Sequence, residues 1–268
     1  MGDDQPRHDP DGPLLVERDG AVLCVTFNRP EQRNAITWEM YEGLREACRR
    51  ADREADDGLR VMVLRGAGGE AFVAGTDIAQ FTGFSGGSAG IDYERRMTAL
   101  LDQLASVRIP TVAVVTGYCV GAGLALAAAC DLRIASHGSR FGVPIARTLG
   151  NCLSMATTAL LVDQLGSSRT LDLLLRARFM GAEEAHAAGF VSEVCEPEQI
   201  ATVAEEIVTR LAAQAPLTMW AAKEAVRRLR AAELPDDADL VHRVYASEDF
   251  ASGVRAFLAK ERPTWKGH

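Results

Sequence analysis

Two glycine-bearing turns, each between an apolar strand-like segment and a helix, most constrain the fold of this chain. The first is AFVAGTDIAQF, residues Ala71–Phe81, and the second is GYCVGAGLALAAACD, residues Gly117–Asp131. In the first, Gly75 permits an unusual backbone angle, and Asp77 is placed to cap the following short helix. Free N–H groups in such turns face an anion or a polarised carbonyl, although an ordinary strand-to-helix turn explains the first segment equally well.

The second turn follows the apolar strand TVAVV and opens an apolar helix. Gly121 and Gly123 flank Ala122 and leave its backbone uncovered by side chains. A dinucleotide-binding loop is the obvious alternative, but it requires a third glycine or alanine and a later acid. Leu126 occupies the third position, and after the turn no acid occurs before Asp163. Together, the two turns can offer one N–H group each to a single oxygen, as an oxyanion hole does.

Strand-like and helix-like segments alternate in the first half of the chain, which predicts an α/β fold with parallel crossovers. The second half is mostly helical and predicts a cap or an oligomer contact. We expect strands at Val22–Phe27, Val61–Leu64, Thr111–Val115 and Leu132–Ala135. We expect helices at Thr37–Asp56, Ile91–Ala105, Leu153–Leu165, Arg169–Leu175, Ala182–Ala188, Ile200–Ala213, Thr218–Ala231 and Asp236–Leu258. Met1–Pro13 is expected to be disordered, and the Gly/Ser-rich segment Gly83–Gly90 to be mobile.

Composition excludes several classes of protein. A net charge of −8 argues against nucleic-acid binding. The longest apolar run is too short to span a bilayer, and no signal peptide is visible, so a cytoplasmic location is expected. The six scattered cysteines predict reduced, mostly buried thiols and no zinc site. We expect no metal and no prosthetic group.

Five segments, in order, resemble the crotonase superfamily, the enoyl-CoA hydratase/isomerase family. They are NRPEQRNAI, AFVAGTDI, TGYCVGAGLALAAACDLRIAS, FGVPIARTLG and FLAKERPTWKG, and they cover nearly the whole chain from Leu14 onward. The resemblance implies a ββα superhelix over residues 14–200, after a disordered segment at 1–13. Residues 201–268 would form a helical oligomerisation region that gives trimers or dimers of trimers.

The resemblance also implies site residues. The oxyanion donors fall on the backbone N–H groups of Thr76 and Ala122, which would polarise a thioester carbonyl. Coenzyme A enters as part of the substrate. The resemblance implies that six positions of the chain contact it. Phe257 and Lys260 match positions that reach the CoA of a neighbouring subunit in similar enzymes, although plain packing and a solvated lysine explain them equally well. The six positions are Arg33, Ala74, Asp77, Ile78, Phe257 and Lys260.

The pattern breaks at the catalytic acids. Hydratases of this family use two glutamates beside the substrate double bond, but here Ala125 and Ile145 occupy the matching positions. Between Gln103 and Val162 the chain has a single acid, Asp131, so a shifted alignment does not restore them. Ordinary hydration is therefore not expected.

Other polar residues could replace the missing acids. Arg147 could bind a substrate carboxylate, although a surface or intersubunit ion pair is the simpler interpretation. Tyr93 and Glu94, after the Gly/Ser-rich segment, could supply a proton from a new direction, or could simply form an ordinary first helical turn. The main hypothesis is an acyl-CoA enzyme that stabilises a thioester enolate. The alternative is a non-catalytic homologue that binds acyl-CoA or serves as an oligomerising subunit.

Overall fold

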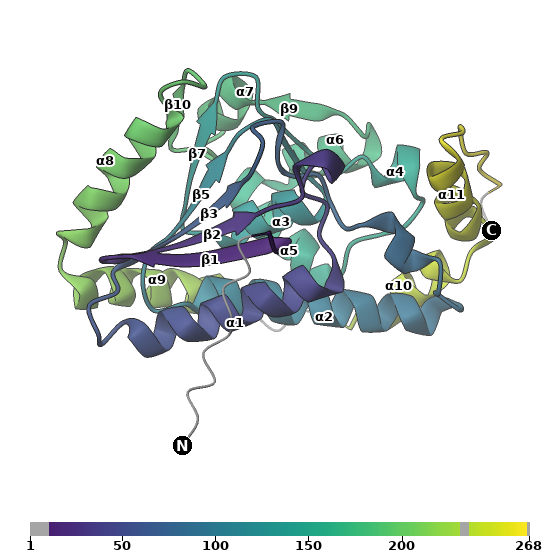
Figure 1. Cartoon of the computed structure of the whole chain (residues 1–268). Helices are drawn as coiled ribbons and strands as arrows, with labels where there is room; N and C mark the ends of the chain where they lie inside the picture. Colours follow the sequence, from purple (N-terminus) through teal and green to yellow (C-terminus); the bar gives the residue numbers. More distant parts are fainter. Residues whose placement is uncertain (1–10, 231–235, 267–268) are drawn as a thin grey trace.

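The strands form two sheets, and in the middle of the chain successive strands alternate between them. Figure 1 shows strands of the larger sheet side by side, with helices around them. The computed structural model describes residues 11–230 and 236–266. Residues 1–10 of the predicted disordered segment, and Ala231 at the end of one predicted helix, lie outside these ranges. The strands are β1 (Leu14–Asp19), β2 (Val22–Phe27), β3 (Val61–Gly66), β4 (Ala71–Val73), β5 (Thr111–Val115), β6 (Tyr118–Val120), β7 (Leu132–Ser136), β8 (Arg140–Gly142), β9 (Phe179–Gly181) and β10 (Glu193–Cys195).

Helices follow the strand pairs and then dominate the second half of the chain. The α-helices are α1 (Trp38–Glu54), α2 (Gly87–Ser106), α3 (Ala122–Ala129), α4 (Ile145–Thr148), α5 (Met155–Leu165), α6 (Ser167–Leu175), α7 (Ala182–Ala187), α8 (Ile200–Ala212), α9 (Pro216–Arg230), α10 (Ala238–Tyr245) and α11 (Glu248–Ala259). Two short 3₁₀ helices are η1 (Pro30–Gln32) and η2 (Ile78–Phe81). Thr37 caps α1 as predicted, because its side chain accepts a hydrogen bond from the Met40 N–H.

The large sheet has the order β1-β2-β3-β5-β7-β10, and the small sheet has the order β4-β6-β8-β9. The pairs β3 and β4, β5 and β6, and β7 and β8 each place their first strand in the large sheet and their second in the small sheet. All pairings from β2 to β10 in the large sheet are parallel. This is the predicted ββα superhelix, and it brings the loops after β4 and β6 to the same side of the molecule.

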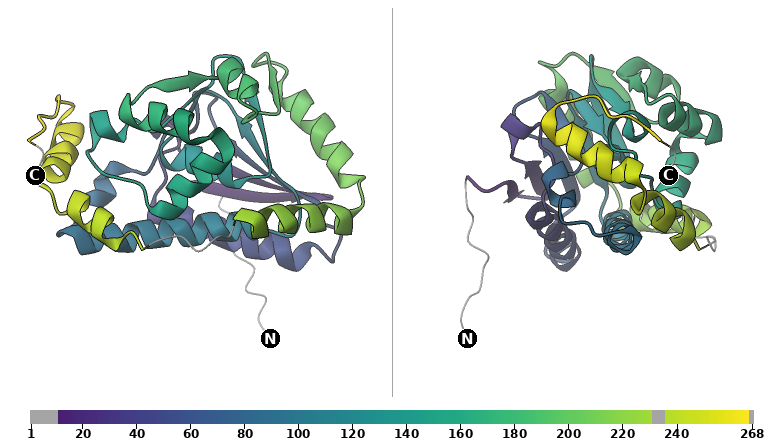
Figure 2. Two further views of the ribbon diagram at one scale, coloured as in Figure 1. Left: turned by 180° about the vertical axis from the view of Figure 1, so that it is seen from behind. Right: turned by 90° about the vertical axis from the view of Figure 1, so that its right-hand side faces the viewer.

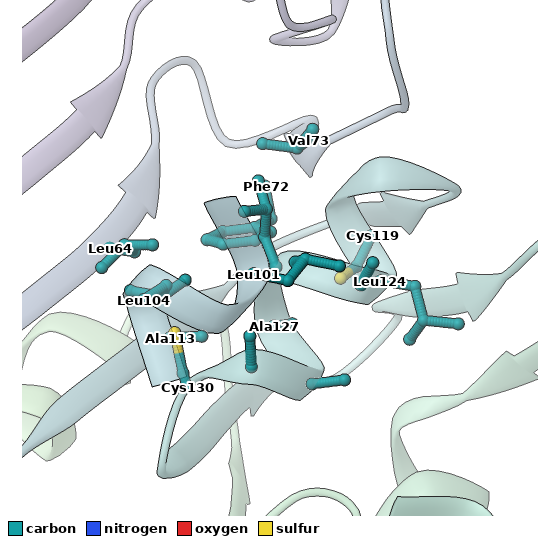
Figure 3. Packing of buried hydrophobic residues seen from close by; sticks show 14 of the residues in the cluster. Leu64, Phe72, Val73, Leu101, Leu104, Ala113, Cys119, Leu124, Ala127 and Cys130 are labelled. Carbon is teal, nitrogen blue, oxygen red and sulfur yellow. The ribbon is translucent and has the colours of Figure 1, made fainter. Parts of the chain in front are cut away.

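The central strands are buried on both faces, as their uninterrupted apolar sequences predict. Val61 and Val63 of β3 face α8, whereas Met62 and Leu64 face the main core between the sheets and α1, α2 and α3. Figure 3 shows part of this core, where Leu101 and Leu104 of α2 and Leu124 and Ala127 of α3 lie near Leu64 of β3. The predicted buried thiols of three cysteines lie in it: Cys48, Cys119 and Cys130.

Two predictions of local structure were wrong. The Gly83–Gly90 segment is not wholly a mobile loop, because α2 begins at Gly87. A Cβ atom on Gly90 would lie 2.1 Å from Cγ of Tyr245, so this glycine allows α2 and α10 to pack closely. The helix predicted over Asp236–Leu258 is two helices, because Ser247 caps a new helix through the N–H of Phe250. The α10 and α11 helices extend beyond the sheets at one end of the molecule (Figure 2).

Candidate active site

The first glycine turn leaves the Thr76 N–H free. Thr76 follows β4 and forms an isolated parallel bridge with Ile36. The Ile36 N–H donates to the Gly75 carbonyl at 2.9 Å, and the Asp77 N–H donates to the Ile36 carbonyl at 2.9 Å. Because successive N–H groups of an extended segment point to opposite sides, the Thr76 N–H points away from Ile36. Within residues 11–230 and 236–266 it has no hydrogen-bond acceptor.

The second turn begins α3. Gly121 has φ +56° and ψ −117°, a conformation that a glycine tolerates and other residues avoid. Its N–H donates to the Gly142 carbonyl at 2.9 Å, and Ala122 is the first residue of the helix. The first N–H groups of a helix have no partner within it, and we find none for the Ala122 N–H elsewhere in the described chain.

The two turns lie against each other. A Cβ atom on Gly121 would lie 3.6 Å from Cα of Gly75, and one on Gly75 would lie 3.7 Å from the Val120 carbonyl oxygen. Gly123 permits this approach, because a Cβ atom there would lie 2.1 Å from the Val73 carbonyl oxygen. The glycines therefore bring the ends of β4 and β6 into backbone contact.

A cavity of about 1060 Å³ opens beside the paired turns, and Thr76 and Ala122 both line it. All six positions implied to contact CoA also line it: Arg33, Ala74, Asp77, Ile78, Phe257 and Lys260. Phe257 and Lys260 belong to the end of α11 and line the cavity of their own chain.

Most of the charged residues that line the cavity form ion pairs or hydrogen bonds within the protein. Asp77 forms an ion pair with Arg29 at 3.0 Å and caps η2 through the Ala79 N–H, as predicted. Arg33 is exposed, lies 3.6 Å from Glu70 and stacks over the Tyr118 ring. Arg147 is not among the described residues that line the cavity. Its guanidinium lies over the Phe179 ring instead, so the structure gives no support to carboxylate binding by Arg147.

Ala125 and Ile145 line the same cavity and present apolar side chains to it. Of the acidic residues that line the cavity in the described ranges, only Glu94 is buried. Its carboxylate accepts hydrogen bonds from the Ser154 N–H at 2.8 Å and from the Tyr245 hydroxyl at 2.9 Å. Burial outweighs these two bonds and raises the pKa of Glu94 to about 7. Glu94 can therefore change protonation state near neutral pH.

Sequence reasoning missed the partners of Glu94. Tyr245 lies 151 positions further along the chain, and its role follows only from the packing of α10 on α2. Asn151 lines the cavity and donates to the Tyr245 hydroxyl at 3.3 Å. Sequence reasoning also missed Tyr41, whose hydroxyl contacts the Thr76 side chain at 2.6 Å.

Asp131, the single acid between Gln103 and Val162, has a structural role. Its carboxylate accepts hydrogen bonds from the Thr111 N–H at 2.7 Å and from the Thr111 hydroxyl at 2.9 Å. It also forms an ion pair with Lys223 of α9 at 2.5 Å. Asp131 is not among the described residues that line the cavity.

Comparisons with known proteins agree with this architecture. A family model described as enoyl-CoA hydratase/isomerase matches residues 17–268. The chain is 32% identical over 265 residues to the (E)-benzylidenesuccinyl-CoA hydratase of Thauera aromatica, covering 95% of this chain and 99% of the relative. It is 32% identical over 262 residues to the 1,2-epoxyphenylacetyl-CoA isomerase of Escherichia coli strain K12, covering 95% and 98%.

A methylmalonyl-CoA decarboxylase crystallised with 2S-carboxypropyl-CoA is structurally similar. It has a TM-score of 0.86 and 25% identity, covering 96% of this chain and 99% of the decarboxylase. The chain therefore belongs to the enoyl-CoA hydratase/isomerase family and has its crotonase fold. It is an acyl-CoA enzyme of that family, whose members act on CoA thioesters. These three relatives are a hydratase, an isomerase and a decarboxylase, so membership does not fix the reaction.

No helix in the described ranges is both long enough and apolar enough to span a membrane.

Proposed function

We propose that this protein binds an acyl-CoA and stabilises the enolate of its thioester with the N–H groups of Thr76 and Ala122. The observation that supports this most directly is the contact between the two glycine turns. Thr76 and Ala122, whose N–H groups have no partner among the described residues, both line one cavity. An enolate oxygen needs donors that are already in place, because reorienting them during the reaction would add to the barrier. Backbone donors meet this need whatever side chain Thr76 carries.

We further propose that the reaction is not hydration by two carboxylates. The motif resemblance implies that Ala125 and Ile145 occupy the positions at which hydratases of the family have their glutamates, and neither side chain exchanges protons. Glu94 is the buried acid that faces the cavity among the described residues, and its pKa of about 7 suits a group that both takes and returns a proton.

One carboxyl group suffices for double-bond isomerisation. The Glu94 carboxylate would take a proton from the α-carbon of a 3-enoyl thioester, and the electron pair of that C–H bond would form the enolate. Protonation of the γ-carbon by the same carboxylic acid would then give the 2-enoyl thioester. Atoms and charge balance within this single exchange, so no co-reactant is required.

At the mouth of the cavity, we propose that Arg33 and Lys260 bind the CoA phosphates. Both are cations that line the cavity. We also propose that the chain forms a homotrimer or a dimer of trimers. Exposed apolar side chains on α9 support self-association: Leu217, Trp220, Val226 and Leu229.

The test is a panel of acyl-CoA thioesters in deuterated water, analysed by mass spectrometry. The panel contains crotonyl-CoA, 3-enoyl-CoA and malonyl-type thioesters. We expect deuterium uptake and conversion of the 3-enoyl thioester, with crotonyl-CoA hydration slow or absent. Fast hydration of crotonyl-CoA would refute the proposal, and binding without exchange or turnover would favour the non-catalytic alternative.

The variant Glu94→Gln tests the proposed proton carrier and leaves the other residues of the site unchanged. This variant should bind the thioester but exchange the α-proton at least about 100-fold more slowly, a common contribution of general acid–base catalysis. Asp102→Asn is the matched control, because Asp102 is on the same helix but does not line the cavity.

A further inference from the structure

A chain of three buried hydroxyl groups lies behind the first glycine turn. The Tyr41 hydroxyl lies 2.6 Å from Oγ1 of Thr76, and that same Oγ1 lies 2.8 Å from the Tyr93 hydroxyl. The Tyr93 hydroxyl lies close enough to Tyr41 to affect its pKa. Among the described residues, however, no hydrogen bond of normal geometry joins the two phenols, and both hydrogen bonds of the unit run through Thr76. The three hydroxyl groups therefore form a linear unit with two internal hydrogen bonds and Thr76 at its centre.

Counting protons shows that one O–H in this unit is left over. Burial raises the pKa of Tyr41 to about 12 and that of Tyr93 well above its ordinary value, so both phenols keep their protons at neutral pH. Three O–H groups then share two internal hydrogen bonds, and each hydrogen bond uses one proton. The third proton needs an acceptor outside the unit, since an unpaired buried donor is unfavourable.

The position of the unit indicates where that acceptor lies. Thr76 and Tyr93 line the cavity, and Tyr41 does not. An oxygen atom bound in the cavity can accept the remaining proton from Tyr93 when Tyr41 donates to Thr76 and Thr76 donates to Tyr93. Tyr93 is held in place for this role, because its ring packs edge-on against Phe81 at 5.0 Å and against Trp38 at 5.9 Å.

We infer that the Tyr93 hydroxyl is a third hydrogen-bond donor to the enolate oxygen, beside the N–H groups of Thr76 and Ala122. The inference rests on the proposed function, because it presupposes that an enolate forms at this point. An oxyanion can accept more than two hydrogen bonds. A buried hydroxyl that donates to it in a site shielded from water therefore adds to its stabilisation. The Thr76 hydroxyl is a positioning group, because its own proton goes to Tyr93 and leaves the Tyr93 hydroxyl free to donate.

The experiment compares the binding of a charged enolate mimic with that of a neutral thioester. 2-Nitronate-propionyl-CoA carries the negative charge of an enolate, and propionyl-CoA does not. Dissociation constants for both are measured by calorimetry with wild type, Tyr93→Phe and Tyr41→Phe. Urea unfolding of each variant verifies that it folds, and the retained ring keeps the packing of Tyr93.

Wild type should bind the nitronate more tightly than propionyl-CoA. Tyr93→Phe should weaken nitronate binding by about tenfold or more, since hydrogen bonds to charged groups are the strong ones, and should change propionyl-CoA binding by less than about threefold. Tyr41→Phe should keep the wild-type preference, because Thr76 and Tyr93 still have one O–H to spare.

The possible failures are distinguishable. If wild type does not prefer the nitronate, the proposed enolate function fails and the inference fails with it. If wild type prefers it and Tyr93→Phe keeps the preference, the third donor is refuted while the two backbone donors stand. An equal loss in Tyr41→Phe and Tyr93→Phe would also refute it, because both tyrosines would then act only through the structure.

Discussion

The raised pKa of Glu94 predicts a specific pH dependence of stability. The unfolded chain ionises this carboxyl at its ordinary value of 4.5, whereas the native protein keeps it protonated up to a pKa of about 7. Between these values the native state holds a proton that the unfolded state has lost, so the free energy of unfolding falls as pH rises. The difference corresponds to about 3 kcal/mol, present in full below pH 4.5 and lost above pH 7.

Glu94→Gln should remove this dependence. Glutamine has nearly the same shape as glutamic acid, and its side-chain oxygen can accept the hydrogen bond from the Ser154 N–H. Because it stays neutral, the variant resembles the protonated form of Glu94 at every pH. From pH 4.5 to pH 8 its stability should therefore rise by about 3 kcal/mol relative to wild type. Urea unfolding at half-unit pH intervals measures both curves, because the midpoint multiplied by the m-value gives the free energy of unfolding.

Glu205→Gln serves as the control, since Glu205 is an exposed carboxyl on α8 whose loss should leave the slope of wild type unchanged. If wild type and Glu94→Gln run parallel across this pH range, the carboxyl is not kept protonated by burial. The assignment of Glu94 as a proton carrier near neutral pH would then be wrong.

Three further changes test other parts of the structure. Gly123→Ala should destabilise the protein by about 3 kcal/mol in urea unfolding, because the new Cβ would lie 2.1 Å from a carbonyl oxygen of β4; Gly83→Ala, where no atom lies within 4 Å, is the control, and equal effects would contradict this. Lys223→Met should cost about 2 kcal/mol, since it leaves Asp131 without its ion pair; unchanged stability would show that the pair is dispensable. Arg33→Gln should weaken acyl-CoA binding about threefold to tenfold at low salt and less at high salt; a salt-independent effect would argue against phosphate contact.

The sequence predicted features that depend on neighbouring residues. The N-cap of Thr37, the capping by Asp77 and the two-sided burial of β3 all follow from short patterns, and the structure confirms them. The motif order likewise predicted the crotonase fold, which the comparisons confirm.

Features that depend on contacts between distant segments could not be predicted. The Gly/Ser-rich sequence around Gly90 predicts a flexible loop, because nothing in it reveals that Tyr245 packs against Gly90. The hydrogen bond between Tyr245 and Glu94 joins residues 151 positions apart, and it contributes to the environment that sets the pKa of the acid. Local patterns located the glycine turns, but the three-dimensional packing determined which side chains share the cavity with them.

The proposed activity depends most on two main-chain amides that hold one oxygen. A crystal structure with 2-nitronate-propionyl-CoA bound would measure this directly, through the distances from the Thr76 and Ala122 nitrogens to the thioester oxygen. We predict that both distances are about 2.7–3.1 Å, the range of a working oxyanion hole. A thioester oxygen more than about 4 Å from either nitrogen, beyond hydrogen-bonding distance, would contradict the account.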